Sequence, residues 1–540
     1  MARTPLLRSI RTLFTDLRVS RATGIPMREL PERRRELLVG RREILRAASA
    51  GAGIAAASWA KPANAARRPS VAIVGGGIAG LSCALGLLDH GVGATVYEGS
   101  GRIGGRMFSN NGGYWSQGQV SEWCGELIDT GHTTIRALAR RFDLRLDDLH
   151  AAEPAGSTET YRFFDRYYPK AQADADFLAI FDALEQDADE AGYPTTFDSF
   201  TPEGKALDHM SIYDWIESRV PGGHGSPLGQ LLDTAYNIEY GADTTVQASL
   251  NLVYLLGFQP EDEPFAVFGV SDERFHIRGG NQLLPQAIAR YLGDAVLTGY
   301  KLAHIERTSS GRVVLTFDVG SSTRQIVADY AVLALPFAVL RELDYSRAGW
   351  SSLKTTAIRE LGRGHNGKLQ LQFDKRLWTQ RGPWGISSGS SYADTGYQSS
   401  WEVSRAQPGA DGLLVFYSGG SVTDSMSTNV PFTTIGANAG VATDANRALG
   451  QVSSVFPGLK PLWNGKATQS LPHKFPFMNA SYSYWRVGQY TGFSGIEGVP
   501  EGNVFFCGEH TSQDFQGFME GGASTGVQTA ADLLDVIRGR

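Results

Sequence analysis

Val71-Ala-Ile-Val-Gly-Gly-Gly-Ile-Ala-Gly80 is the stretch of sequence that decides the fold. A short apolar run, residues 71–74, leads directly into a glycine-rich turn, and apolar side chains then recur with helical spacing from Ile78 to Leu88. The succession of strand, turn and helix is typical of the first half of a dinucleotide-binding βαβ unit. It therefore predicts a nucleotide site close to residue 75.

The glycines of this turn have different expected roles. Gly75 permits the tight turn, Gly77 lets the backbone approach a pyrophosphate, and Gly80 allows the helix to pack closely on the strand. The N–H groups at the start of the helix, those of Ile78 and Ala79 included, are then free to bind phosphate oxygens.

Two further features complete the expected nucleotide site. A second strand, residues 94–98, ends in Glu98, whose carboxylate stands where a ribose diol needs an acceptor. The turn Arg102-Ile-Gly-Gly-Arg106 follows, and a guanidinium on a Gly-Gly turn can reach the same pyrophosphate.

The C-terminal end of the chain is also rich in small residues. Residues 503–506 read as a strand, and the stretch 517–526 opens a helix that extends to about Arg538. Gly522, Ala523 and Gly526 lie on adjacent turns of that helix. We expect them to let it approach a flat ring closely, while its free N–H groups stabilise negative charge there.

These blocks resemble those of the flavin-containing amine oxidase family. The positions that match its N-terminal motifs are Gly75, Gly77, Gly80, Glu98, Gly104, Gly105 and Arg106. Those that match its C-terminal motifs are Gly508, Glu509, Thr511 and residues 517–526. The resemblance covers nearly the whole chain after residue 65 and is weakest over residues 151–270. It implies an FAD cofactor, with Glu509 on the ribose or ribityl hydroxyls.

The resemblance also implies further cofactor contacts. The backbone of Leu302 is expected at the adenine, and Phe518 and Met519 at the flavin. The block that reads G-x-M-R in some members contributes Gly125, Glu126, Leu127 and Ile128. The family often has an arginine two residues after its ribose glutamate, whereas this chain has Ser100.

The fold class expected from these patterns is α/β. A discontinuous Rossmann-like FAD-binding domain of the GR2 type comprises residues 66–150, 270–345 and 485–540. Residues 151–269 and 346–484 form an α+β substrate-binding domain.

Lys368 is the first candidate for the chemistry. It alternates with apolar residues in the segment 367–373, so that Lys368, Gln370 and Gln372 share one strand face, which taken alone reads as a solvated face. The family's lysine block, however, is matched by Gly364, Lys368, Phe373 and Trp378. By that resemblance Lys368 holds a water beside flavin N5, where a cation also stabilises negative charge during oxygen reduction.

Aromatic side chains are expected to form the wall that receives the substrate. Phe518 matches the family position on one side of the flavin, and Tyr482 or Tyr484 matches the other, although the tyrosine pair also fits core packing at a strand end. Such rings exclude water and favour a neutral amine. Some members tether the flavin through a cysteine at the position of Ser481, so we expect non-covalent FAD here.

The sequence leaves the substrate open. L-amino acid oxidases commonly bind the substrate carboxylate through the arginine of the G-x-M-R block, which this chain lacks. Arg486 could replace that cation, or the substrate could be a plain amine. Trp401 and Glu402 fall near a substrate-contacting position, where a buried glutamate could attract a second cationic group.

Oxidative deamination is the predicted activity. The substrate, an L-amino acid or a primary amine, passes a hydride to FAD, the imine is hydrolysed, ammonia is released, and oxygen is reduced to hydrogen peroxide. Two alternatives remain. One is a flavin-dependent desaturase or porphyrinogen-type oxidase acting on C–C bonds. Lys368 and the aromatic pair are evidence against this alternative. The other is an exported FAD-binding protein without turnover.

Composition excludes several classes of function. The chain has 540 residues, 42% hydrophobic and 20% charged, which is ordinary for a globular protein. Three scattered cysteines and the absence of a CxxC or Cys/His cluster predict neither a disulfide framework nor a structural metal. The net charge of -6 divides into +8 for residues 1–65 and -14 for the remainder. This acidic remainder argues against a nucleic-acid partner.

Residues 1–65 resemble a twin-arginine export signal. Arg41 and Arg42 precede an apolar run from Ala47 to Trp59, which ends near Ala63-Asn-Ala65. The run is too short to span about 30 Å of hydrocarbon. An organellar transit peptide is the alternative for this Arg-rich segment. We expect an exported protein without a transmembrane anchor, and the oligomeric state stays open, a homodimer included.

Overall fold

The computed structural model describes residues 69–258 and 265–539. The predicted strand, helix and strand at the start of this part form as β1 (Val71–Val74), α3 (Ile78–Asp89) and β2 (Ala94–Glu98). The mixture of parallel and antiparallel sheets with helices confirms the α/β class. The predicted signal, residues 1–65, lies outside the described residues.

Five parallel strands form the sheet that carries the glycine-rich turn. Their order is β23-β13-β1-β2-β9, and every neighbouring pair is parallel. The strands not yet given are β9 (Val296–Thr298), β13 (Tyr330–Leu333) and β23 (Val504–Phe506). The five strands come from three segments that are far apart in the sequence, residues 71–98, 296–333 and 504–506. Because all five run in one direction, their carboxyl ends share one edge of the sheet.

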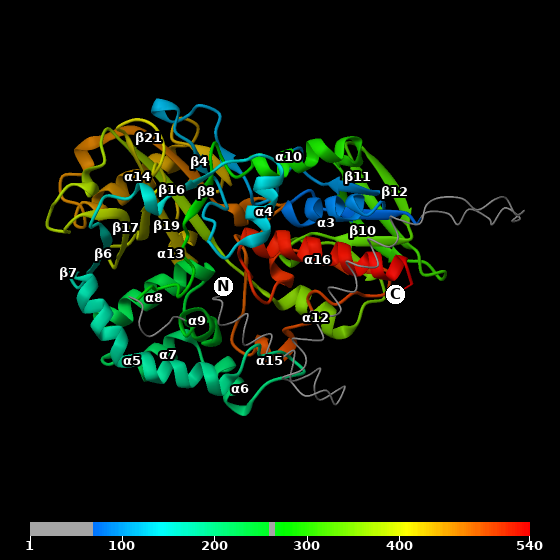
Figure 1. Ribbon diagram of the computed structural model, residues 1–540, viewed down its shortest axis with the longest axis horizontal. Helices are drawn as coiled ribbons and strands as arrows, with labels where there is room; N and C mark the ends of the chain where they lie inside the picture. Colours follow the sequence, from blue (N-terminus) through cyan, green and yellow to red (C-terminus); the bar gives the residue numbers. More distant parts are fainter. Residues whose placement is uncertain (1–68, 259–264, 540) are drawn as a thin grey trace, which may run out of the picture. The chain divides into compact units, whose positions relative to one another are not determined.

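Both faces of this parallel sheet are covered, which explains why β1 is apolar on both sides. Val71 and Ile73 pack with α3 and α16 (Met519–Ile537), which lie side by side in Figure 1. Ala72 and Val74 pack toward a mixed sheet of order β12-β11-β10-β14, in which β10 and β14 are parallel and the other neighbours antiparallel. Its strands are β10 (Lys301–Arg307), β11 (Val313–Val319), β12 (Ser322–Ala328) and β14 (Asp344–Arg347).

Two glycines set how closely α3 approaches its neighbours. A Cβ at Gly80 would stand 2.1 Å from the Gly75 carbonyl oxygen, as expected where a helix packs on its own strand. A Cβ at Gly526 would stand 2.2 Å from the carbonyl oxygen of Ala79. The small residues of α16 therefore serve mainly to bring that helix against α3. Of Gly522, Ala523 and Gly526, only Gly522 lines the cavity described below.

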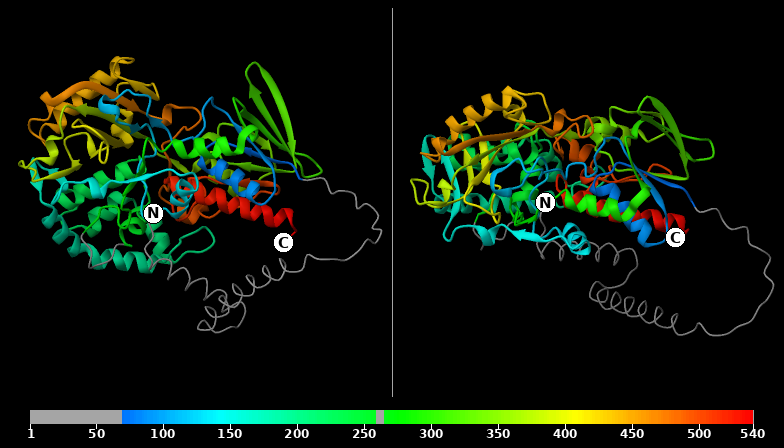
Figure 2. Two further views of the ribbon diagram at one scale, coloured as in Figure 1. Left: turned by 45° about the horizontal axis from the view of Figure 1, so that its top comes forward. Right: turned by 90° about the horizontal axis from the view of Figure 1, so that it is seen from above.

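A second, eight-stranded sheet has the order β20-β21-β16-β19-β18-β17-β6-β7. Its strands are β6 (Thr158–Phe163), β7 (Arg166–Tyr168), β16 (Asn366–Phe373), β17 (Ser387–Ala393), β18 (Gln398–Glu402), β19 (Gly412–Gly419), β20 (Phe432–Thr434) and β21 (Trp463–Ser470). All neighbours are antiparallel except β17 and β6. Figure 2 shows this sheet in two further orientations.

Helices accompany the eight-stranded sheet. Those of the middle segment are α5 (Lys170–Ala191), α6 (Pro202–Asp208), α7 (Ile212–Arg219), α8 (Pro227–Tyr240) and α9 (Leu250–Leu256). The apolar face of β16, formed by Leu369, Leu371 and Phe373, packs with α14 (Ala439–Val452).

The opposite face of β16 is polar and yet buried, so the solvated face that the alternation by itself would indicate does not form. Gln370 Nε2 donates to the Glu122 carbonyl at 2.8 Å, and Gln372 Nε2 donates to Gln119 Oε1 at 2.9 Å. The strand thus faces a segment of the N-terminal part of the chain. These hydrogen bonds join the second sheet to the nucleotide-binding part.

Within the described ranges, no helix combines the length and apolarity needed to cross a membrane. Cys83, Cys124 and Cys507 are buried free thiols.

Candidate active site

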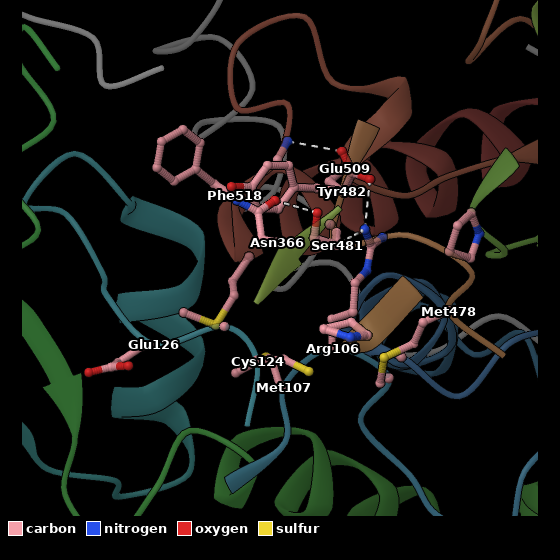
Figure 3. Close-up of a pocket in the computed structure, with 18 of the residues that line it drawn as sticks. Arg106, Met107, Cys124, Glu126, Asn366, Met478, Ser481, Tyr482, Glu509 and Phe518 are labelled. Atoms are coloured by element: carbon pink, nitrogen blue, oxygen red, sulfur yellow. Dashed lines mark hydrogen bonds and ion pairs between the residues drawn. The ribbon is translucent and has the colours of Figure 1, made fainter. Parts of the chain in front are cut away.

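A single cavity collects most of the residues that the sequence pointed to (Figure 3). Those on its wall are Gly75, Gly77, Ile78, Ala79, Glu98, Gly105, Arg106, Gly125, Glu126, Leu127, Lys368, Trp401, Tyr482, Gly508, Glu509, Phe518 and Met519. Those absent from its wall are Gly80, Ile128, Leu302, Glu402, Tyr484 and Arg486.

The glycine-rich turn forms one end of the cavity. Gly77 precedes the first turn of α3, and no side chain caps the helix there, so its first N–H groups stay available. A Cβ at Gly77 would meet nothing nearer than the Gly105 Cα at 3.9 Å, so any side chain would stand in the open space. Glu98 accepts from the Gly76 N–H at 2.7 Å and from the Ser100 hydroxyl at 2.7 Å. This end can receive a phosphate against the helix and a hydroxyl at Glu98.

Arg106 and Glu509 join the two ends of the chain across this space. Arg106 Nη1 donates to Glu509 Oε1 at 2.9 Å and to the Ser481 carbonyl at 2.9 Å, and Figure 3 shows these three residues converging. Glu509 also accepts from the Ser483 hydroxyl at 2.7 Å and from the Gly517 N–H at 2.9 Å. Burial by itself would raise the pKa of Glu509. The Arg106 guanidinium and the hydrogen bonds to the carboxylate outweigh burial and lower this pKa below its ordinary value.

A second helix start borders the cavity. α16 begins at Met519 behind Phe518, and no side chain caps it. Two helix N-termini with partial positive charge therefore point to one cavity. The space beside Gly77, the Arg106 guanidinium and the buried Glu509 carboxylate complete the arrangement, which fits an anionic dinucleotide.

Lys368 reaches the cavity from β16 and has protein partners. Its Nζ donates to the Cys124 carbonyl at 2.7 Å and to Glu126 Oε2 at 2.6 Å. The indole N–H of Trp401 donates to the other oxygen of Glu126 at 2.9 Å. Burial opposes ionisation of Glu126, yet the Lys368 ammonium outweighs it and keeps the pKa of Glu126 below its ordinary value. Glu126, expected at the cofactor, thus forms an ion pair with the candidate catalytic lysine.

Tyr482 belongs to an aromatic wall, whereas Tyr484 does not. The Tyr482 hydroxyl donates to the Ile238 carbonyl at 3.0 Å and lies 3.0 Å from the Tyr417 hydroxyl. The rings of Tyr417 and Trp401 meet edge to face, with centroids 5.1 Å apart. Tyr484 pairs with Gly362 and packs in the core, the alternative that the sequence left open.

Two carboxylates of the cavity were missed by the sequence analysis. Glu239 lies at the end of α8, and Glu273 follows the gap in the described chain. Burial raises the pKa of Glu239 to about 7 and that of Glu273 well above its ordinary value. Among the described residues neither carboxylate has a hydrogen bond or an ion pair. No motif marks these positions, and only the tertiary structure brings them to the cavity.

Three of the expected site residues lie away from the cavity wall. Glu402 accepts from the Trp378 indole N–H at 2.7 Å and pairs with Arg376 Nε at 2.7 Å, so it stabilises its own strand region. Arg486 is exposed and lies off the cavity. The side chain of Leu302 is buried within β10, where the residue pairs with Phe317, and the contact of its backbone with the adenine stays a prediction.

The arginines and the lysine on the cavity wall are all engaged. Arg102 donates to the carbonyls of Gly105 and Met107, Arg106 pairs with Glu509, and Lys368 with Glu126. As far as residues 69–258 and 265–539 show, none of these cations is left for the carboxylate of a substrate.

Comparison with known proteins agrees with this geometry. A family model described as flavin containing amine oxidoreductase matches residues 78–534. Polyamine oxidase 6 of Oryza sativa subsp. japonica is 25% identical over 497 residues, which cover 87% of this chain and 91% of that protein. An L-amino acid dehydrogenase of Synechocystis is 25% identical over 338 residues, 59% of this chain and 66% of that protein. In fold, the structure of cyclohexylamine oxidase from Brevibacterium oxydans is similar, with a TM-score of 0.72 and 20% identity over 87% of this chain and 100% of that one.

Proposed function

Because this chain belongs to the flavin-containing amine oxidoreductase family, we propose that it holds FAD non-covalently and oxidises an amine bearing a second positive charge. The amine is converted to an imine that water hydrolyses to a carbonyl product and ammonia, and oxygen is reduced to hydrogen peroxide. The observation that carries the substrate class is a pair of carboxylates, Glu239 and Glu273, on the same cavity wall as Lys368, which have no partner among the described residues.

The cavity residues support non-covalent FAD. The N-terminus of α3 and the Arg106 guanidinium would hold the pyrophosphate, and Glu98 and Glu509 the hydroxyls. Ser481 stands where a tethering cysteine occurs in some members. Cys124 also lines the cavity, but burial raises the pKa of its thiol to about 11, which keeps it protonated and unreactive.

Bound FAD supplies the hydride acceptor and returns the electrons to oxygen. The protein supplies the surroundings. The rings of Tyr482, Tyr417 and Trp401 exclude water and favour a neutral reacting nitrogen, which releases hydride from its carbon more readily. Lys368 places a cation, held in position by Glu126, where negative charge develops during oxygen reduction.

Two charge arguments favour a diamine or polyamine over an L-amino acid. Burying unpaired carboxylates is costly, and a substrate ammonium beside Glu239 or Glu273 would offset that cost by restoring their ionised form. A substrate carboxylate finds no free arginine or lysine on the described wall of the cavity, and it would face two acidic groups instead.

The test begins with the visible spectrum of the purified protein and with acid precipitation, which should release FAD into the supernatant. Anaerobic mixing then compares 1,4-diaminobutane with its matched control butylamine, and L-lysine with L-leucine. We expect the diamine to bleach the flavin with at least about tenfold higher kcat/KM than butylamine. Flavin that no panel member bleaches contradicts deamination, and a preference for L-leucine contradicts the substrate class.

We further propose that residues 1–65 direct export of the folded protein with its cofactor. Support comes from the Arg41-Arg42 pair, the apolar run and the Ala63-Asn-Ala65 stretch. The full chain expressed in a bacterium should reach the periplasm, and replacing both arginines with lysine should retain it in the cytoplasm. Periplasmic protein that persists in that double variant contradicts the proposal.

A further inference from the structure

A group of metal-ligating side chains lies outside the amine-oxidising cavity. His365, Asp424 and His473 each offer one ligand atom, and these atoms lie within 4.8 Å of one another. His365 Nδ1 is 2.9 Å from Asp424 Oδ1, and His473 Nε2 is 4.0 Å from the same oxygen. The two imidazole rings stack with centroids 4.4 Å apart. In the described part of the chain, no other group of His, Cys, Asp and Glu has this spacing.

Separate elements bring the three side chains together. His365 directly precedes β16, Asp424 ends α13 (Gly420–Asp424), and His473 lies in a short 3-10 turn at residues 472–474. The His365 backbone is fixed on both sides: its N–H donates to the Gly241 carbonyl at 2.7 Å, and its carbonyl accepts from Gly420 at 3.0 Å. Because His365 and Asp424 are 59 residues apart, no short motif marks this site in the sequence.

Among the three side chains, His473 gives the strongest indication that the group binds a ligand. It is only 8% exposed, and neither of its ring nitrogens has a hydrogen-bond partner among residues 69–258 and 265–539. A buried polar atom without a partner destabilises the folded state, because it has lost its hydrogen bonds to water. The Nε2 atom is near the Asp424 carboxylate but too far for a hydrogen bond. A cation between the two would satisfy both groups.

We propose that His365, Asp424 and His473 bind one divalent transition-metal ion, Zn²⁺ foremost, with water completing its coordination. Two imidazole nitrogens and one carboxylate oxygen are ligands that Zn²⁺ prefers. Zinc bonds of about 2.0–2.1 Å place tetrahedral ligands about 3.3 Å apart, so the separations of 2.9 and 4.0 Å from Asp424 need adjustments of under about 1 Å. The separation of the two histidine nitrogens, at most 4.8 Å, needs an adjustment of no more than about 1.5 Å. The Asp424 side chain is 51% exposed, which gives the ion a route from solvent.

The surrounding charges bear on the affinity. Lys474 follows His473 in the chain and Arg363 lies near it, and both cations repel a metal ion. We therefore expect a dissociation constant on the order of micromolar, weaker than in closed structural zinc sites.

Such an ion would act as a structural link at the rim of the active site. Asn366 follows His365, Pro472 precedes His473, and both residues line the cavity. Coordination would tie the start of β16, which carries Lys368, to the 472–474 turn. The three ligands themselves do not line the cavity, so the ion would not touch the reacting atoms.

The experiment uses tag-free holoprotein, treated with EDTA, dialysed and titrated with ZnCl₂ by isothermal calorimetry. We expect one Zn²⁺ per chain and a higher Tm with the metal. His365→Ala and Asp424→Asn, both at partly exposed positions, should each weaken binding at least about tenfold with an unchanged flavin spectrum. His90→Ala, which removes an exposed histidine bonded only to the Gly86 carbonyl, should leave binding unchanged.

A spectroscopic measurement identifies the ligands independently of affinity. Cu²⁺ bound to the wild type should show electron paramagnetic resonance couplings to two imidazole nitrogens, and His365→Ala should retain one. The proposal is overturned if Zn²⁺ binds with equal affinity to the wild type, His365→Ala and Asp424→Asn. It is also overturned if the wild type shows no 1:1 binding.

Discussion

At the scale of single residues, the Lys368–Glu126 pair links the candidate chemistry to the stability of the protein. Both side chains are buried, and their atoms are 2.6 Å apart. Removing one member of such a pair leaves an uncompensated buried charge and costs about 3–5 kcal/mol. A mutation of Lys368 alone therefore mixes an effect on oxygen chemistry with an effect on folding.

We predict that Lys368→Met keeps bound flavin but slows its reoxidation by oxygen, on the order of a hundredfold, because a positioned cation is lost. Stopped-flow mixing of the reduced protein with oxygen measures the rate. The control is Glu126→Gln, which keeps the lysine and should retain most of that rate. The double variant should recover stability without recovering the oxygen rate, and unchanged oxygen kinetics in Lys368→Met would remove its assigned role.

We predict that Glu239→Gln raises KM for 1,4-diaminobutane about tenfold and leaves kcat and the KM for butylamine unchanged, because only the diamine presents a second ammonium. Steady-state peroxide assays give both parameters. An equal rise for both amines would show that Glu239 shapes the cavity without recognising charge.

The pH dependence of this KM follows from the pKa of Glu239, which burial raises to about 7. The group is protonated below that value and ionised above it, so the diamine KM of the wild type should fall between about pH 6 and about pH 8. The Glu239→Gln variant has no such ionisation and should lose most of this dependence. A pH profile identical in both proteins contradicts the role of Glu239.

At the scale of elements, the contact between α3 and α16 decides whether the two ends of the chain form one cofactor site. Gly526 lies against the backbone of α3, where any Cβ would overlap the Ala79 carbonyl. β16 illustrates a different point. Its alternating polar face looks solvated in the sequence, but those side chains are buried against residues 119–124.

We predict that Gly526→Ala destabilises the protein by about 1–3 kcal/mol, because the added methyl group forces α16 away from α3. Its matched control is Gly450→Ala on α14, where an added Cβ meets no atom within 4 Å. That change should stabilise by up to about 1 kcal/mol through helix propensity. Urea unfolding of both holoproteins tests the pair, and equal effects would contradict the close helix contact.

At the scale of the whole molecule, FAD should act as a linker between segments that are far apart in the sequence. Residues 75–106, 481–483 and 508–522 all contribute to the cavity wall. A ligand that binds only the folded state stabilises it in proportion to the logarithm of its concentration.

We predict that removing FAD lowers Tm and that added FAD restores it, with a gain of about 2.7 kcal/mol at a hundredfold excess over Kd. Riboflavin, which lacks the pyrophosphate expected at α3 and Arg106, should restore far less. Differential scanning calorimetry of the apoprotein with each ligand measures both. Equal restoration by riboflavin contradicts the assigned pyrophosphate site.

The sequence by itself determined the parallel sheet, the glycine-rich turn of α3 and most of the nucleotide-binding wall, because these depend on local steric requirements. A turn that must approach a phosphate needs glycine wherever it occurs, so Gly75, Gly77 and Glu98 could be recognised without a fold. The order of the strands in the sheet, by contrast, came only from the tertiary structure.

Only the tertiary structure decided which side chains face the substrate and which stabilise their surroundings. Glu239 and Glu273 are brought to the same cavity wall as Lys368, whereas Glu402 lies off that wall and contacts Trp378 and Arg376. Periodicity identifies the faces of a strand but not what packs on them, because desolvation and partner geometry arise only when separate segments meet.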